Sequence, residues 1–340
     1  MSTLRIGDFD ILPGEQRKIN LPVAKLYTDA SVSLPVHIIR AKNPGPTIFI
    51  SAAVHGDELN GIEIIRRLIR QNKLSITKGT VIAVPMVNVY GVVNQSRYMP
   101  DRRDLNRYFP GSAKGSLAGR VAHIFMKEIV AHCNYGIDLH TGAVHRSNLP
   151  QIRADMNDPE TKELAETFGV PVVLNSNLVD GSLREAAVEK NTKILLYEAG
   201  EALRFDEFSI RAGMKGIINV LQHLGMKRRS KSKKKTPFIA NGSQWVRANA
   251  SGIVNNIANL GDQITKGQVL AEIGSPYGEV LDNVIATRSG ILIGKQNIPL
   301  VQEGEAMFHI AYFDADDEEI AEQIENIQES LLPDLADSRY

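Results

Sequence analysis

The sequence predicts an α/β protein that carries a second, all-β unit toward its C-terminus. From residue 47 onward, short apolar runs alternate with stretches of helical periodicity, which is typical of a sheet flanked by helices. After Gly225 the chain changes to short β-like stretches separated by glycines, and this shift indicates a domain boundary. The 340 residues are enough for two domains of ordinary size.

Each element of the first unit follows from its local pattern. Residues 1–46 contain apolar segments punctuated by proline and glycine, so we expect an irregular β lead-in there. The expected strands span residues 47–53, 81–87, 135–139, 170–174 and 194–197. The expected helices span residues 59–70, 119–132, 158–169 and 205–224. The third helix has both ends marked, because Asp158-Pro159 opens it and Gly169 closes it.

The second unit, residues 238–312, resembles the small β barrel-sandwich of biotinyl and lipoyl domains. Such carriers hold their cofactor on a lysine in the turn that follows the first half of the fold. Residues 273–284, which would form that turn, contain no lysine. We therefore expect this unit to wall the active site or to form an oligomer interface rather than to carry a cofactor.

Two charged segments flank the β unit. Seven bases lie between Lys227 and Lys235, in a predicted linker at 227–237 that we expect to be a solvated loop. Acidic residues crowd the tail, 313–340, in which four apolar residues have helical spacing: Ile320, Ile324, Ile327 and Leu331. This spacing predicts an acidic amphipathic helix that could dock against the basic run, within the chain or across a dimer.

Charge and cysteine content narrow the function classes. Lys+Arg and Asp+Glu each total 39, and this balance disfavours a protein that binds nucleic acid or a membrane surface. The single cysteine, Cys133, cannot form a disulfide within the chain. No stretch is apolar enough for a membrane span or a signal peptide. We therefore expect a cytoplasmic protein with neither a nucleic-acid partner nor a membrane.

Two predicted strand ends carry the residues of a metal site. The run 47–53 leads into His55-Gly-Asp-Glu58, and the run 135–139 leads into His140. Strands fixed in a sheet hold such side chains rigidly. Two histidines and one glutamate form a catalytic zinc set because they leave a fourth tetrahedral position open, whereas a structural site would usually need cysteines. We predict one Zn²⁺ per chain.

Two further segments suit hydrolysis of a substrate that carries a carboxylate. The loop 97–111 is dense in arginine, whose planar fork matches the two oxygens of a carboxylate. Glu198 ends another apolar run, where a carboxylate is well placed to act as a general base.

Five motifs in order resemble the succinylglutamate desuccinylase/aspartoacylase family, a branch of the zinc carboxypeptidase-like hydrolases. They are HGDE (55–58), RDLNRYFPG (103–111), DLHTG (138–142), LREAA (183–187) and YEAG (197–200). The resemblance implies a zinc-carboxypeptidase-like mixed-sheet catalytic domain at 1–226, followed by the small all-β domain. It also implies a deacylase that hydrolyses the amide bond of a small anionic N-acyl amino acid. The resemblance is compatible with a homo-oligomer, but the sequence does not define the oligomeric state.

Roles for individual residues follow from the same resemblance. His55, Glu58 and His140 would bind zinc, and Glu198 would deprotonate the zinc-bound water. Arg97 would polarise the scissile carbonyl, with Arg102 or Arg103 as alternatives because the spacing to DLNR is long. Asp104 would orient His55. Three residues would bind the acidic groups of the substrate: Asn106, Arg107 and, for a second acidic group, Arg184.

Some residues and functions stay open at this level. His145 could line the pocket mouth, and Tyr277 could contact the substrate. Five histidines are expected to be structural: His37, His123, His132, His223 and His309. The alternative enzyme is a metallocarboxypeptidase acting on short peptides, since the same residues serve both reactions. A zinc-free relative is disfavoured because every ligand position is filled. The sequence defines neither the acyl group nor the amino acid.

Overall fold

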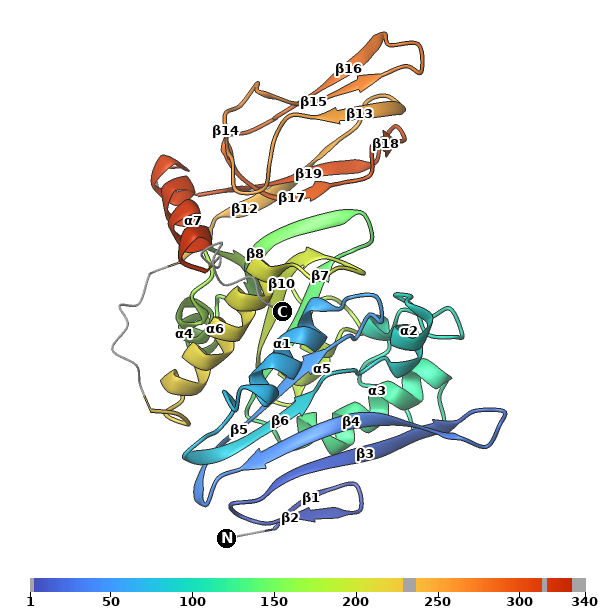
Figure 1. The fold of residues 1–340 in the computed structure, drawn as a ribbon, viewed down its shortest axis with the longest axis vertical. Coiled ribbons are helices and arrows are strands. Elements are labelled where there is room, and N and C mark those ends of the chain that lie inside the picture. Colours follow the sequence, from blue (N-terminus) through green and yellow to red (C-terminus); the bar gives the residue numbers. More distant parts are fainter. Residues whose placement is uncertain (1–2, 229–236, 314–316, 332–340) are drawn as a thin grey trace.

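One large mixed sheet runs through most of the molecule (Figure 1). The computed structural model describes residues 3–228, 237–313 and 317–331. Most of the predicted basic linker and the end of the acidic tail lie outside the described residues. None of the helices in the described ranges is long and apolar enough to cross a membrane.

The bounds of the elements in the first unit are as follows. Its first half contains β1 (Leu4–Ile6), β2 (Phe9–Ile11), β3 (Gln16–Lys25), β4 (Ser31–Arg40), β5 (Asn43–Ala52), α1 (Asn60–Arg70), β6 (Lys78–Val84), α2 (Val89–Asn94) and the 3₁₀ turn η1 (Leu105–Arg107). Its second half contains α3 (Leu117–Glu128), the 3₁₀ turn η2 (Val130–His132), β7 (Tyr135–Gly142), β8 (Arg146–Ala154), α4 (Pro159–Phe168), β9 (Val172–Asn175), α5 (Leu183–Glu189), β10 (Lys193–Glu201) and α6 (Glu207–His223).

The C-terminal unit is built of strands and one final helix. It contains β11 (Phe238–Ala240), β12 (Gly242–Arg247), β13 (Gly252–Asn256), β14 (Gln263–Ile264), β15 (Val269–Gly274), β16 (Val280–Ile285), β17 (Gly290–Gln296), β18 (Leu300–Val301), β19 (Ala306–Tyr312) and α7 (Asp317–Leu331).

The middle of the large sheet is parallel and its two ends are antiparallel, while β9 and β11 form a parallel branch that starts at β8. The strand order is β12-β19-β17-β8-β10-β7-β5-β6-β4-β3, with β10, β7, β5 and β6 as parallel neighbours. One face is covered by α1, α4 and α6, and the other by α3, α5 and the β1–β2 hairpin. Because parallel strands end at the same edge, the segments that follow β5, β7 and β10 meet there.

The predicted elements of the first unit agree with the structure in type, with small shifts of their ends. The helix predicted at 158–169 is α4, whose N-cap Asp158 accepts a hydrogen bond from the Thr161 amide and whose C-cap Gly169 has φ 86°. The sequence analysis missed β8 altogether. The β lead-in predicted at residues 1–46 consists of strands in the structure. β3 and β4 have 10 residues each and pair antiparallel at one end of the sheet, with a register shift between Pro22 and Ala24.

The C-terminal strands divide between two sheets. β12, β17 and β19 extend the large sheet, because β17 pairs antiparallel with β8. β16, β15, β13 and β18 form a separate antiparallel sheet, and a hydrophobic core lies between the two. The acidic helix α7 packs Ile320 and Ile324 into a further cluster that includes Leu149 of β8. The C-terminal unit therefore continues the sheet that carries the candidate site.

Candidate metal centre and substrate pocket

One turn and one strand place a buried glutamate and two buried histidines at the carboxyl edge of the sheet: the turn after β5 carries His55 and Glu58, and β7 carries His140. After β5, Ala53 adopts a left-handed φ of 52°, which is costly for a residue with a Cβ and typical of functional turns. Gly56 follows, where a Cβ would lie 2.0 Å from the backbone of Gly91. Only glycine fits this approach, and the turn then presents His55 and Glu58 just before α1.

The carboxylate of Glu58 lies between the two imidazoles. Its Oε1 is 2.7 Å from His55 Nδ1, and its Oε2 is 2.8 Å from His140 Nδ1. One ligand atom from each of the three residues lies within 4.8 Å of the others. The structure thus brings together the three residues that the sequence analysis proposed as metal ligands, at exposures of 2–4%.

A second carboxylate holds the far nitrogen of each imidazole. Asp104 Oδ1 is 3.1 Å from His55 Nε2, and Asp138 Oδ2 is 2.8 Å from His140 Nε2. Asp138 is held in turn by the hydroxyl of Ser51, which donates to Oδ1 over 2.7 Å. Metal-bound histidines usually have such a carboxylate on the other ring nitrogen. With Nε2 of each ring engaged by its own carboxylate, the two Nδ1 atoms face Glu58, on the side where a metal would bind. The donor set of two imidazoles and one carboxylate fits zinc.

The electrostatics of the cluster also suit a cation. Burial alone would raise the pKa of Glu58, but the adjacent His55 and His140 lower it below its usual range. Burial would lower the pKa of His140, yet the carboxylates of Asp138 and Glu58 raise it well above its usual value. The carboxylates thus favour positive charge at this position, which is the environment that a divalent cation needs.

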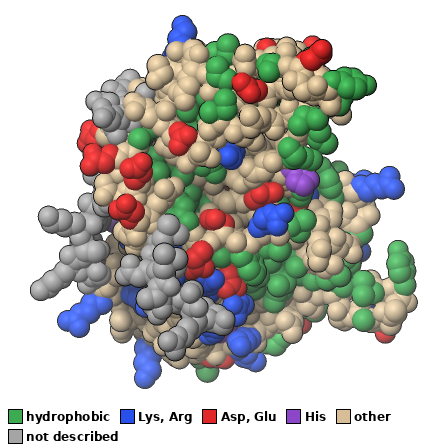
Figure 2. Space-filling view, turned by 45° about the horizontal axis from the view of Figure 1, so that its top comes forward, with side chains coloured by type: hydrophobic (Ala, Val, Ile, Leu, Met, Phe, Trp, Pro, Cys, Tyr) green, Lys and Arg blue, Asp and Glu red, His purple; other side chains and the backbone are tan. Residues whose placement is uncertain are grey.

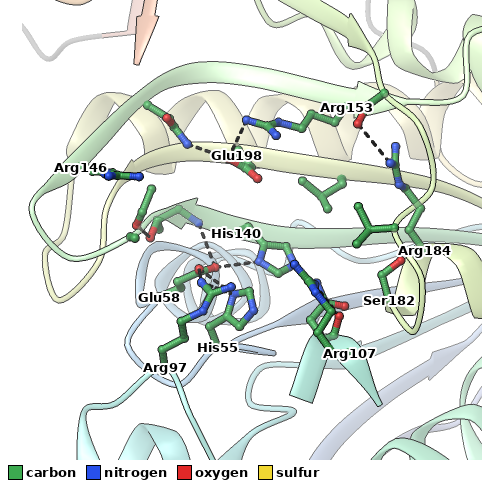
Figure 3. Close-up of a pocket in the computed structure, with 18 of the residues that line it drawn as sticks. His55, Glu58, Arg97, Arg107, His140, Arg146, Arg153, Ser182, Arg184 and Glu198 are labelled. Atoms are coloured by element: carbon green, nitrogen blue, oxygen red, sulfur yellow. Dashed lines mark hydrogen bonds and ion pairs between the residues drawn. The ribbon is translucent and has the colours of Figure 1, made fainter. Parts of the chain in front are cut away.

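Glu198 lies beside the cluster because its strand is a neighbour of β7. In the parallel β7–β10 pair, Glu198 is directly opposite His140, so both side chains share one face of the sheet. The Nδ2 of Asn148 donates to Glu198 Oε2 over 2.6 Å, and Arg153 Nη2 lies 3.5 Å from the same oxygen. Two residues of β8 therefore hold this carboxylate from above (Figure 3).

Arg97 is the arginine that reaches the cluster from its own loop. Its Nη2 donates to Asp104 Oδ2 over 2.9 Å, and its Nη1 lies 3.5 Å from Glu58 Oε1. Arg103 instead bonds Tyr108 and Asp101, and neither it nor Arg102 lines the pocket. Among the three arginines considered from sequence, only Arg97 is thus placed beside the cluster.

The predicted substrate-binding residues lie at one end of the same pocket. The amide oxygen of Asn106 accepts a hydrogen bond from Leu183 N over 2.8 Å, which ties η1 to α5. Arg107 is exposed, and its Nη1 donates to the carbonyl of Asn106. Arg184 is 6% exposed and donates to Ser176 Oγ and to the carbonyl of Asn177, while its Nη1 is buried without a partner among the described residues. Burial, together with the nearby Arg153, lowers the pKa of Arg184.

The pocket is a cavity of about 260 Å³ that the metal cluster, Glu198 and the arginines share. Figure 2 shows charged side chains of both signs gathered in the middle of this face. The sequence analysis missed four of the residues in the pocket wall: Arg146, Asn148, Arg153 and Trp245. Trp245 belongs to β12 of the C-terminal unit. Five arginines against two glutamates line the pocket, so it favours anions.

Other residues weighed from the sequence lie elsewhere. Tyr277 is 91% exposed in the β15–β16 turn and does not line the pocket. His145 lines a neighbouring groove rather than the pocket itself. His37 bonds Gln16, and His223 lies 3.6 Å from Glu163. His309 is buried directly behind Trp245.

Fold and site together define an α/β protein whose buried His-Glu-His cluster can hold one metal ion at the carboxyl edge of a mixed sheet. The chain belongs to the succinylglutamate desuccinylase/aspartoacylase family. The model of that family's catalytic domain matches residues 44–224, which is more than half of the chain. This match confirms the resemblance drawn from the five motifs.

Individual relatives extend the comparison. An N-alpha-acetyl-L-2,4-diaminobutyric acid deacetylase of Halomonas elongata is 28% identical over 83% of this chain and 86% of its own length. A succinylglutamate desuccinylase of Pseudomonas aeruginosa is 29% identical over 48% of this chain and 53% of its own length.

Solved structures support the fold. A succinylglutamate desuccinylase from Silicibacter sp. TM1040 has a TM-score of 0.78 at 24% identity, covering 88% of this chain and 97% of its own. The ectoine utilization protein EutE (DoeB) from Ruegeria pomeroyi has a TM-score of 0.77 at 23% identity, covering 88% and 97%. At such identities the likeness establishes the arrangement of the chain and leaves the substrate undefined.

Proposed function

We propose that this protein is a zinc-dependent amidohydrolase that releases the acyl group from a small N-acyl amino acid. The observation that carries the proposal is the buried His55–Glu58–His140 cluster beside Glu198, within one arginine-lined pocket. Membership of the desuccinylase/aspartoacylase family and the deacetylase and desuccinylase relatives support it.

His55, Glu58 and His140 would hold one zinc ion. When bound, zinc supplies a Lewis acid that lowers the pKa of water toward about 7 and polarises a carbonyl. Asp104 and Asp138 keep the two imidazoles in the orientation that such binding needs, because each occupies the other ring nitrogen.

Glu198 and Arg97 carry the proton and charge steps. Glu198 takes a proton from the attacking water and later passes it to the departing amine nitrogen. Asn148 keeps this carboxylate in place through its hydrogen bond to Oε2. Arg97 donates to the carbonyl oxygen as negative charge builds on it, and such donors commonly contribute about 3–4 kcal/mol to the transition state.

The substrate carboxylate binds at the end of the pocket formed by η1 and α5. Arg107 and the NH₂ group of Asn106 bind one carboxylate, and the unpartnered Nη1 of Arg184 is available for a second acidic group. The Halomonas relative is named for a substrate with a second amine. Five arginines in the pocket disfavour a cationic side chain here and favour an anionic substrate.

The C-terminal unit closes the pocket rather than carrying a cofactor. We propose the division into a catalytic domain at 1–226, a linker at 227–237, a barrel-sandwich unit at 238–312 and an acidic tail. Trp245 reaches the pocket wall from this unit. A pocket of about 260 Å³ favours a small substrate over the chain of a peptide, which argues against the metallocarboxypeptidase alternative.

The test is a substrate panel assayed with zinc-loaded and with chelator-treated protein. We expect N-acyl amino acids to be hydrolysed only by the zinc-loaded form, and blocked dipeptides to be hydrolysed poorly by either. Hydrolysis that is faster for the dipeptides would favour the carboxypeptidase. Equal activity after complete removal of metal would contradict the role of the His55–Glu58–His140 cluster.

A further inference from the structure

The end of the pocket away from Arg107 and Arg184 contains a further arginine, Arg146, whose guanidinium lies over a tryptophan ring. Arg146 begins β8, two residues before Asn148, so alternation along the strand places both on the face that carries Glu198. In Figure 3, Arg146 and Arg184 lie at opposite ends of the pocket, with His140 and Glu198 between them. Arg146 also lines the neighbouring groove, so it forms the border of the pocket.

The guanidinium of Arg146 lies over two stacked aromatic rings that belong to the C-terminal unit. It lies 5.5 Å from the ring centroid of Trp245. Trp245 stacks on His309, with centroids 4.5 Å apart and planes 9° apart, and these two residues are directly opposite each other in the β12–β19 pair. His309 is 4% exposed. Burial, aided by the charge of Arg153, lowers its pKa to about 3, so it is a neutral ring beneath Trp245.

Arg146 differs from Arg97 and Arg153 of the same pocket in its partners. Arg97 pairs with Asp104 and Arg153 with Glu198, whereas Arg146 has no carboxylate partner among the described residues. The Trp245 face orients the guanidinium without using its N–H donors. An oriented cation with free donors at a pocket wall is suited to a carboxylate, which arginine binds with two parallel hydrogen bonds.

We propose that Arg146, oriented by Trp245 and His309, recognises a terminal carboxylate on the acyl group of the substrate. This inference rests on the proposed function, in which Arg107 and Arg184 hold the amino-acid part. The amide then lies at the His-Glu-His cluster, and the acyl chain extends toward Arg146. The preferred acyl group is thus the half-amide of a short dicarboxylic acid, such as a succinyl group, rather than acetyl.

Trp245 provides a direct readout, because it is the single tryptophan of the chain. Zinc-loaded protein is titrated with succinate or with butyrate, which has the same chain length and lacks the second carboxylate, while tryptophan fluorescence is recorded. We expect succinate to change the emission and to bind roughly 10- to 100-fold more tightly than butyrate. The Arg146→Gln variant should lose this preference. Equal binding of succinate to wild type and Arg146→Gln would overturn the inference.

Arg288→Gln is the matched control, because Arg288 stacks on Tyr312 in the same unit and lies outside the pocket wall. Its succinate preference should equal that of the wild type. In kinetics, the ratio of kcat/KM for an N-succinyl over an N-butanoyl amino acid should fall roughly 10- to 100-fold in Arg146→Gln and less in Arg146→Lys.

The two proposals fail in different ways. A wild type that hydrolyses neither substrate contradicts the proposed function, while the fluorescence titration still tests the subsite. Hydrolysis by the wild type with the same substrate ratio in Arg146→Gln contradicts the subsite alone.

Discussion

Replacement of Asp138 by asparagine tests whether the metal site depends on the residues behind its ligands. Asp138 is 2% exposed and lies 2.8 Å from His140 Nε2, while its other oxygen accepts from Ser51. Asparagine fills the same space, so no cavity forms, but it replaces the charged acceptor of the imidazole by a neutral amide. Removing such outer partners typically lowers metal affinity 10- to 100-fold, which corresponds to about 1.4–2.7 kcal/mol.

The assay is competition for zinc between the protein and a chromophoric chelator. We expect the zinc dissociation constant of Asp138→Asn to rise roughly 10- to 100-fold. Ser51→Ala is the matched control, because it removes the partner of Asp138 and leaves the contact between Asp138 and His140 in place. Its dissociation constant should rise less. A folded Asp138→Asn variant that binds zinc as tightly as the wild type would refute the reasoning.

Three further predictions concern catalysis and stability. Glu198→Gln should bind zinc as the wild type does and lose turnover roughly 10²- to 10⁴-fold; wild-type turnover in a steady-state assay would remove Glu198 from the mechanism. The pKa of Asp158 is lowered to about 2, first by the hydrogen bond from Lys193 and then by Thr161. Because the carboxyl of Asp158 has a lower pKa in the folded chain than in the unfolded chain, where it is about 3.9, its ionised form stabilises the fold at pH values above that value. This stabilisation is lost as the pH falls toward 2. Asparagine can also cap a helix, so Asp158→Asn keeps the N-cap of α4. The difference in melting temperature between wild type and this variant should therefore be smaller at pH 3 than at pH 6; an equal difference at both pH values would contradict the prediction. Ile324 of α7 is 1% exposed, and Ile324→Ala should lower the free energy of unfolding by about 2–5 kcal/mol in denaturant titrations. Glu325→Ala, at an exposed position of the same helix, is the control. Equal losses of unfolding free energy in the two variants would show that Ile324 does not anchor α7.

The ligand cluster could be predicted from sequence because its residues follow short apolar runs. His55 lies just beyond β5, His140 and Glu198 lie in the last part of β7 and of β10, and these three strands are parallel neighbours. Their ends must meet at one edge whatever the details of the loops. The proximity of the proposed ligands could thus be predicted without knowing the order of the remaining strands.

The rest of the pocket could not be found in this way. β8 includes Pro150 and alternates polar with apolar residues, so it lacks the apolar run that marks the other strands. Because the sequence analysis did not predict β8, it could not place Arg146, Asn148 and Arg153 on the face of the sheet that lines the pocket. Trp245 lies about 100 residues further along the chain than Arg146, and tertiary pairings such as that of β17 with β8 bring its unit to the site.

Through that pairing, the C-terminal unit also helps to position Glu198, the proposed general base. β17 joins β8 where Gly294 is opposite Asn148, and a Cβ on Gly294 would lie 3.0 Å from the side-chain oxygen of Asn148. Asn148 in turn donates to Glu198. Glycine at this position therefore leaves room for the amide in the orientation that Glu198 requires. The same unit supplies Trp245 to the pocket wall. Deleting it would thus remove a wall of the pocket and also expose the strand edge on which the position of Glu198 depends.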